Sequence, residues 1–118
     1  MTINEYQREA LRTEAGMNKD PSIIDSPTFR LQNGLMGLCG EAGEAIDILK
    51  KHLFQGHDLD TEHLALELGD CCWYIAVAAN AIGYDLEKIL TMNRAKLRAR
   101  YPDGFNPELS MNRKEGDI

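Results

Sequence analysis

The segment from about residue 61 to residue 82 constrains the fold most, because apolar side chains surround its helical axis on nearly every side. The apolar residues are Leu64, Leu66, Leu68 and the run from Cys71 to Ala79. Such a helix is typically buried all round. Glu67 and Asp70 nevertheless stand in its middle, and a bare carboxylate in an apolar interior costs several kcal/mol unless it is paired or bound to a metal ion. The segment therefore predicts a buried helix whose acids have a partner.

A second segment, 27–54, has one apolar stripe at three- and four-residue spacing, formed by Leu31, Leu35, Leu38, Ala42, Ile46, Leu49 and Leu53. Ser26 before Pro27 is typical of an N-cap followed by proline in the first turn. Four glycines recur every three residues in this segment: Gly34, Gly37, Gly40 and Gly43. Together they would cost a helix roughly 4 kcal/mol relative to alanine. Either a neighbouring helix approaches closely or a ligand needs space there; the alternative is that the segment is a loop.

The remaining patterns are also helical. Thr2 and Glu5 form a capping-box pattern that predicts a helix over 3–14. Asp85 is an N-cap candidate for a helix over about 85–100, and 16–27 is rich in loop-forming residues. Because no period-two strand of useful length is visible, we expect an all-α, four-helix-bundle-like subunit.

Length and charge limit the other possibilities. The 118 residues fit one domain, and the net charge of −6 argues against a basic face for duplex nucleic acid. We find neither a membrane-spanning run nor a secretion signal, so we expect no membrane partner. Cys39, Cys71 and Cys72 form no C-x-x-C pair, which favours reduced thiols and a cytoplasmic protein. The polar tail 107–118 is expected to pack against the rest rather than to move freely.

Two acidic pairs are the candidate metal ligands. Glu41 and Glu44 lie three residues apart in one predicted helix, and Glu67 and Asp70 do so in the next, so each pair shares a helix face. A short connection makes the two helices antiparallel neighbours, which brings the pairs to one level. Four converging carboxylates favour a hard divalent cation, Mg²⁺ or alternatively Mn²⁺. The competing interpretation is that these are ordinary solvated acids, which is weakest for Glu67 and Asp70.

Other metal and phosphate motifs fit less well. No His/Cys spacing matches a closed zinc site, so we interpret His52, His57 and His63 as surface or helix-end residues. The Glu-x-x-His pairs of ferritin-like di-iron sites are missing, because the fourth position is Glu44 or Asp70. A glycine-rich loop ending in Gly-Lys-Ser/Thr is also missing.

A cationic face is the candidate phosphate-binding element. Asn93, Lys96 and Arg100 fall within about 60° of arc on the predicted 85–100 helix, and these groups suit phosphate oxygens. Lys51, on the Glu44 face, is a weaker candidate. A solvated face with surface ion pairs is the alternative. Trp73 is a weaker candidate for stacking on a base, since a core position is favoured.

The acidic spacing resembles that of a known family. Glu41-x-x-Glu44, 22 residues and then Glu67-x-x-Asp70 is similar to the metal motif of the MazG-type, all-α nucleoside triphosphate pyrophosphohydrolases. The flanking Gly37–Ala45, Leu68-Gly69-Asp70 before Trp73-Tyr74, and the run from Asn93 to Phe105 also resemble that family. The resemblance covers about 28–106, so 1–118 is expected to be one MazG-like domain with the tail added.

The resemblance implies an enzyme that hydrolyses a nucleoside triphosphate to the monophosphate and pyrophosphate, often in nucleotide-pool housecleaning. Carried over by position, Glu41, Glu44, Glu67 and Asp70 would bind the metal ion. Asn93, Lys96 and Arg100 would hold phosphates. Glu41 and Glu44 are both candidates for the general base. Phosphoribosyl-ATP, dUTP and dCTP pyrophosphohydrolases share the scaffold, so the base and sugar stay open.

Two other function classes are also compatible with the sequence: a metal-dependent nucleotide sensor without turnover, and a helical interaction protein whose acids are incidental. A helix that is apolar all round needs more cover than three others provide, so we expect a homodimer or homotetramer. Neighbouring subunits would then complete a base pocket, for which the weak candidates are Tyr6, Gln7, Phe29 and Trp73.

Overall fold

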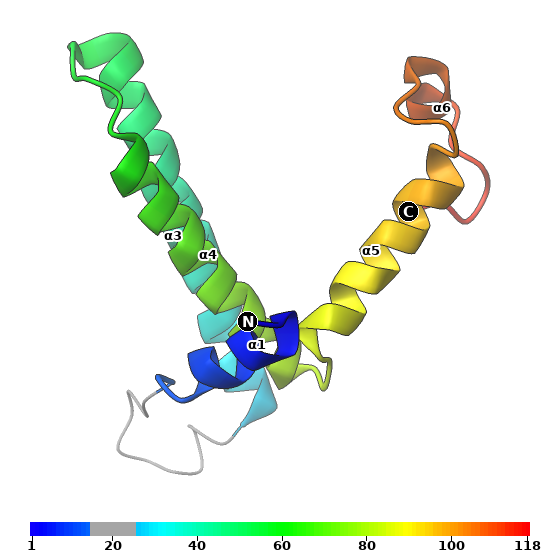
Figure 1. Ribbon diagram of the computed structural model, residues 1–118, viewed down its shortest axis with the longest axis horizontal. Coiled ribbons are helices and arrows are strands. Elements are labelled where there is room, and N and C mark those ends of the chain that lie inside the picture. Colours follow the sequence, from blue (N-terminus) through cyan, green and yellow to red (C-terminus); the bar gives the residue numbers. More distant parts are fainter. Residues whose placement is uncertain (15–25) are drawn as a thin grey trace. The chain divides into compact units, whose positions relative to one another are not determined.

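The computed structural model describes residues 1–14 and 26–118. In these residues it contains helices and no strand, which confirms the all-α class (Figure 1). The helices are α1 (Ile3–Leu11), α3 (Pro27–Gln55), α4 (Thr61–Ala81), α5 (Leu86–Arg100) and α6 (Pro107–Met111). Most of the predicted 16–27 loop lies outside the described residues. The chain divides into two compact units, Met1–Leu86 and Glu87–Ile118, and each is described by itself.

The first helix begins with the predicted capping box. The Thr2 hydroxyl accepts a hydrogen bond from the Glu5 N–H, and the Thr2 N–H donates to the Glu5 carboxylate at 2.6 Å. The helix ends at Leu11, three residues earlier than predicted. The cause is local, because both the N–H and the hydroxyl of Thr13 turn back to the Ala10 carbonyl and close the chain into a tight turn.

The second predicted helix is continuous from Pro27 to Gln55, so the alternative that its glycine-rich part forms a loop is wrong. Ser26 is the N-cap and accepts a hydrogen bond from the Phe29 N–H, as predicted. Gly56 ends the helix with φ 72°, a left-handed conformation that glycine adopts without a steric penalty. The third helix begins as predicted after Asp60, whose side chain accepts from the His63 N–H.

Helices α3 and α4 lie side by side as a long antiparallel hairpin (Figure 1). A Cβ atom added at Gly34 would lie 3.0–3.2 Å from the Cβ, N and Cα atoms of Ala78. A Cβ atom added at Gly37 would overlap the ring of Tyr74. Two of the four glycines therefore allow the helices to approach closely, which offsets part of their cost to helix stability.

Helix α1 packs on α4 through a small core and a set of hydrogen bonds. The core contains Ala10, Ala76 and Leu86, all buried. The buried amide of Gln7 donates to the carbonyls of Ala76 and Tyr84 and accepts from the Leu86 N–H. These three bonds tie α1 to α4 and to the connection that follows α4.

The prediction that the 61–82 helix is buried on all sides is wrong for the single chain. Glu67 and Ala76–Ala79 are buried, but Leu66 is 65% exposed, Leu68 is 56% exposed and Asp70 is also exposed. The reason is that α3 and α1 cover only part of the circumference of α4.

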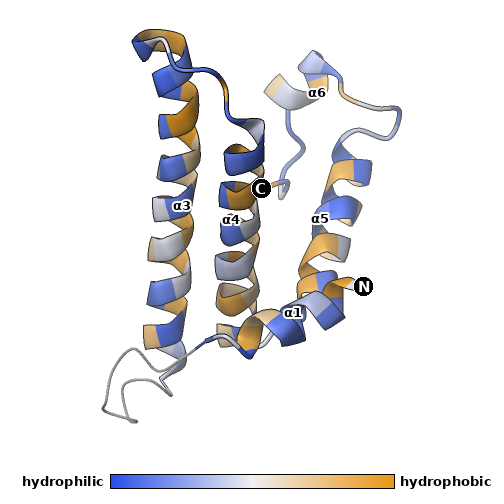
Figure 2. Cartoon of the chain, turned by 60° about the vertical axis from the view of Figure 1, so that its left-hand side comes forward, coloured by the Kyte–Doolittle hydropathy of each residue, from blue (hydrophilic) through white to orange (hydrophobic). Residues whose placement is uncertain are grey.

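Hydrophobic and hydrophilic segments alternate along α3 (Figure 2).

Within the part of the chain that the structure describes, no single helix is long and apolar enough to cross a membrane; the bent pair α4 and α5 would pass only when both are counted together.

The second unit contains most of α5, the short helix α6 and the tail. Helix α6 was not predicted; it begins after Asn106, whose side chain accepts from the Glu108 N–H at 2.8 Å. The Arg100 guanidinium donates to both carboxylate oxygens of Asp117, at 2.7 and 2.6 Å, and to the Ile118 carbonyl at 3.0 Å. The expectation that the tail packs against the rest of the chain is therefore confirmed.

Candidate metal centre

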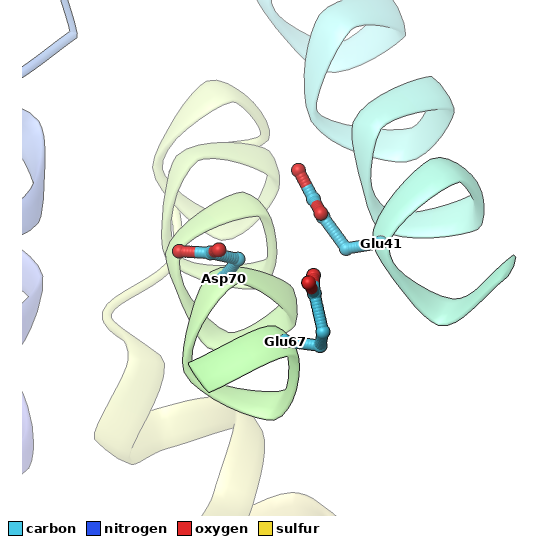
Figure 3. Close-up of side chains that lie close together, drawn as sticks. All are labelled: Glu41, Glu67 and Asp70. Atoms are coloured by element: carbon cyan, nitrogen blue, oxygen red, sulfur yellow. The ribbon is translucent and has the colours of Figure 1, made fainter. Parts of the chain in front are cut away.

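Three of the four predicted metal ligands converge between the two long helices. One carboxylate oxygen from each of Glu41, Glu67 and Asp70 lies within 4.8 Å of the others. Glu41 comes from α3, while Glu67 and Asp70 come from α4, and the three side chains lie close together between the helices (Figure 3). The expected meeting of the two acidic pairs is therefore found for Glu41, Glu67 and Asp70.

The antiparallel hairpin explains this convergence. Gly34 and Gly37 lie against Ala78 and Tyr74 respectively, so a step forward along α3 corresponds to a step back along α4. One further turn along α3 brings Glu41 level with Asp70 and Glu67. The close glycine contact thereby sets the separation of the helices at the carboxylates.

The electrostatics of the cluster are those of crowded acids. The pKa of Glu41 is raised by burial, by the charge of Glu44, by a hydrogen bond with Glu67 and by the charge of Asp70. Glu67 is only 6% exposed, and its Oε1 lies 2.9 Å from Nε2 of His63, one turn earlier on α4. The three acids therefore need a positive partner, since like charges this close disfavour joint ionisation.

The donor set fits a hard divalent cation. Two ligand oxygens on an octahedral Mg²⁺ are about 2.9 Å apart when adjacent and about 4.1 Å apart when opposite. The oxygens of the cluster, within 4.8 Å of one another, need only small side-chain movements to reach those distances. All three donors are carboxylates, which suit Mg²⁺ or Mn²⁺ better than a soft metal ion.

Glu44, the fourth predicted ligand, lies outside this group. Its side chain is exposed and lines a neighbouring pocket of about 400 Å³, together with Gly40, Gly43, Lys51 and Glu67. A Cβ atom added at Gly40 or Gly43 would meet no heavy atom within 4 Å. These two glycines are therefore not needed for helix packing in the described chain, and they leave open space beside the acids.

Lys51 lines the same pocket but is paired with an acid. Its Nζ lies 2.7 Å from Asp47 Oδ2, and Lys50 Nζ lies 2.9 Å from Asp47 Oδ1. These two bonds lower the pKa of Asp47 to about 2. Lys51 is thus held one turn along α3 from Asp47, and its predicted contact with phosphate stays a prediction.

The predicted phosphate-binding residues Asn93, Lys96 and Arg100 lie on α5, in the second unit. Asn93 and Lys96 are exposed, whereas the side chain of Arg100 is only 10% exposed because it is paired with Asp117. This pairing raises the pKa of Arg100. The phosphate role of all three residues stays a prediction.

The weaker base-pocket candidates have structural contacts in the single chain. Trp73 Nε1 donates to the Ala10 carbonyl and to the Thr13 hydroxyl, at 3.1 and 2.7 Å, and Gln7 bonds to backbone as described. Tyr6 packs against the small core, whereas Phe29 is partly exposed. Trp73 is half-buried and packs against the small core, and its stacking on a base stays a prediction.

His63 is the residue at the centre that sequence analysis missed. It was interpreted as a surface or helix-end histidine, and its side chain is indeed about half exposed. Its position four residues before Glu67 puts the two on one helix face, which is the signal that could have identified the pair.

Comparison with known proteins gives one family and one relative. The sequence model of the MazG nucleotide pyrophosphohydrolase domain matches residues 29–105. The "Gene 37 protein" of Mycobacterium phage L5 is 38% identical over 73 residues, covering 58% of this chain and 64% of that protein. The chain therefore spans less than two thirds of the length of this relative. No solved structure gives a significant match.

Proposed function

Because the chain belongs to the MazG nucleotide pyrophosphohydrolase domain family, we propose that it hydrolyses a nucleoside triphosphate to the monophosphate and pyrophosphate with the help of Mg²⁺. The observation that carries the proposal is the convergence of Glu41, Glu67 and Asp70 inside the matched region. Mn²⁺ is the alternative ion. Housecleaning of the nucleotide pool is the role we propose for this activity.

The residues divide the chemical work between them. Glu41, Glu67 and Asp70 would hold the ion, which supplies polarisation of phosphate oxygens and a water of lowered pKa when bound. His63 would hold the Glu67 carboxylate in place through its Nε2. Such a partner fixes the orientation of a ligand before the ion arrives.

Glu44 is the better of the two candidates for the general base. Glu41 belongs to the converging group, so its oxygens would be occupied as ligands. Glu44 lies outside that group and lines the pocket beside it, where its carboxylate can accept a proton from the attacking water. Gly40 and Gly43 leave room there for the phosphate chain, and Lys51, Asn93, Lys96 and Arg100 are the candidates for neutralising its charge.

The decisive experiment is a screen of the standard ribo- and deoxyribonucleoside triphosphates with Mg²⁺, in which pyrophosphate release is measured. Hydrolysis in ¹⁸O-labelled water should place the label on the monophosphate if water attacks the α phosphorus. Orthophosphate as the first product would contradict the proposal. The same screen, extended to phosphoribosyl-ATP, dUTP and dCTP, would identify the preferred substrate.

A nucleotide sensor with the same metal centre is the second candidate function. The observation that favours it is the ion pair with Asp117, which occupies Arg100, a side chain that turnover would use on the leaving pyrophosphate. Tight Mg²⁺-dependent nucleotide binding without turnover would support it. Turnover with any nucleotide would exclude it.

We also propose that the chain acts as a homodimer or homotetramer in the cytoplasm. The exposed Leu66 and Leu68 offer apolar side chains to other copies on two sides of α4. The free cysteines Cys39, Cys71 and Cys72 suit a reducing compartment. Light scattering tests the assembly, and a single species of about 13.3 kDa would contradict it.

A further inference from the structure

The second unit contains a pocket that joins two proposed phosphate-binding residues, Lys96 and Arg100, to tail residues that the proposed reaction does not use. It has a volume of about 330 Å³ and lies between the end of α5 and the tail. Its charged lining residues are Lys96, Arg100, Arg113, Lys114, Glu115 and Asp117. Four cations and two acids leave a net positive pocket in a chain whose overall charge is −6.

Asp117 lies at the centre of the positive charge. Its carboxylate accepts two hydrogen bonds from the Arg100 guanidinium, in the fork geometry by which arginine also binds phosphate. The hydrogen bonds and charge of Arg100 hold the pKa of Asp117 below its ordinary value, and Arg113 and Lys96 add to this effect. Both side chains are largely covered, with exposures of 10% for Arg100 and 18% for Asp117. The carboxylate therefore occupies a site built for an anion.

The tail that supplies this carboxylate lies outside the family match, which ends at residue 105. Residues 107–118 add α6 and then return the chain to α5, so that Asp117 reaches Arg100 across 17 residues of sequence. The contact is thus a property of this chain beyond the matched domain. It occupies an arginine that the sequence analysis assigned to phosphate.

We propose that this pocket is a binding site for a phosphoanhydride chain, and that Asp117 is a built-in competing anion which the ligand displaces from Arg100. The ligand class is inorganic pyrophosphate or the polyphosphate part of a nucleotide. The choice of ligand rests on the proposed function, whereas the competition between Asp117 and an anion does not.

Charge and tethering act in opposite directions on this competition. A pyrophosphate carries several negative charges against the one of Asp117, so the four cations favour it. Asp117 has the advantage of being tethered, which gives it a high effective concentration at Arg100. If the tail is closed in about nine molecules of ten, removing the competing charge raises apparent affinity about tenfold.

The test is the binding of inorganic pyrophosphate to wild-type protein and to Asp117→Asn, measured by calorimetry in metal-free buffer. Without metal ions the carboxylates of Glu41, Glu67 and Asp70 repel the ligand, so binding reports the basic pocket. We expect Asp117→Asn to bind about tenfold tighter than wild type. Glu115→Gln is the matched control, because it removes one negative charge from the same pocket without touching the Arg100 fork; we expect a change of less than about twofold.

Nuclear magnetic resonance of the Arg100 Nε–H group locates the binding. The chemical shift of this group should change when pyrophosphate is added to wild-type protein. The substitution Asp117→Asn should change it even without pyrophosphate, because it alters the acceptor of the Nε–H hydrogen bond. Equal affinities for wild type and Asp117→Asn, or equal gains for Asp117→Asn and Glu115→Gln, would overturn the proposal. So would the absence of any binding to Asp117→Asn while its thermal melting shows a folded protein.

Two further measurements identify the ligand and distinguish failure of this proposal from failure of the proposed function. Pyrophosphate binding tighter than that of a nucleoside triphosphate assigns the site to the released product, and the reverse order assigns it to the substrate. In a turnover assay, a site for the substrate predicts a lower KM for Asp117→Asn, and a site for the product predicts stronger inhibition of Asp117→Asn by added pyrophosphate. Tighter pyrophosphate binding without any turnover would leave the competition standing and remove the proposed enzyme function.

Discussion

The two halves of the α3–α4 hairpin differ in how they use glycine. In one half Gly34 and Gly37 lie against Ala78 and Tyr74, so a missing Cβ lets the helices touch. In the other half Gly40 and Gly43 border open space beside Glu44 and Glu67. A repeat that looks uniform in the sequence therefore serves packing at one end and space at the other.

This difference is what places the acids. The half with Gly34 and Gly37 holds the helices at a fixed separation. The other half carries Glu41, Glu67 and Asp70, whose negative charges repel one another. Buried Glu67 and half-buried Glu41 are stabilised only partly by His63 and by sharing a hydrogen bond. Close packing and the acidic cluster are thus separated along a single pair of helices, and substitutions in each half should have opposite effects on stability.

The largest effect is expected from Glu67→Gln in the acidic half. Loss of an outer-shell partner of a metal ligand already costs about 10–100-fold, so loss of the ligand should lower kcat/KM at least about a hundredfold. The thermal midpoint in metal-free buffer should not fall, because the substitution removes a repelling buried charge. Kinetics and melting with Mg²⁺ or EDTA measure both.

Glu62→Gln is the control for this experiment, since it removes the same charge from the exposed first turn of α4. It should leave kcat/KM within about twofold of wild type. Wild-type turnover by Glu67→Gln would end the metal-ligand assignment.

The second effect is a loss of stability in the packed half. Gly37→Ala places a methyl group in the Tyr74 ring, which itself packs edge-on against Trp73 with ring centroids 4.9 Å apart. We expect a net loss of about 1–3 kcal/mol from overpacking, read as a lower midpoint in urea. Gly34→Ala should act in the same direction, because the atoms it meets include helix backbone of Ala78. A more stable Gly37→Ala would show that the close approach is not required.

The third effect is smaller and has the opposite sign. Gly40→Ala and Gly43→Ala meet no neighbour, so each should stabilise the helix by about 0.5–1 kcal/mol. The same added methyl groups narrow the pocket beside Glu44, so KM for the nucleotide should rise. Denaturant unfolding and steady-state kinetics on one preparation test both statements. Destabilisation by these variants would mean that a second copy of the chain covers this surface.

The smallest effect is a dependence of stability on pH. The folded-state pKa of Glu41 is raised, so the folded protein binds this proton more tightly than the unfolded chain does. In metal-free buffer this group therefore lowers the free energy of unfolding as pH rises from about 4.3 through the raised pKa. Glu41→Gln should remove that component, and unfolding in urea between pH 4 and pH 7 measures it. If the free energy of unfolding depends on pH in the same way for wild type and Glu41→Gln, the pKa of Glu41 is not the one that is raised.

Local patterns predicted most of the elements. Thr2, Ser26 and Asp60 each satisfy N–H groups at a helix start, and these hydrogen bonds span only a few residues. The three-residue spacing of the acids and the short connection between the helices predicted that Glu41, Glu67 and Asp70 meet, but they also placed Glu44 in the group, which it does not join. By contrast, α6 was not predicted, because its five residues carry no apolar period.

The sequence by itself determined the helices and the acids at one level of a hairpin, because helix periodicity and capping act over a few residues. It also contained the four glycines, but not their separate uses, since which glycine meets a neighbour depends on how two helices are aligned. Only the tertiary structure decided that Gly34 and Gly37 pack against α4 and that Asp117 returns to Arg100. Each of these depends on where a side chain or a distant segment comes to lie, and spacing along one helix carries too little information to determine that.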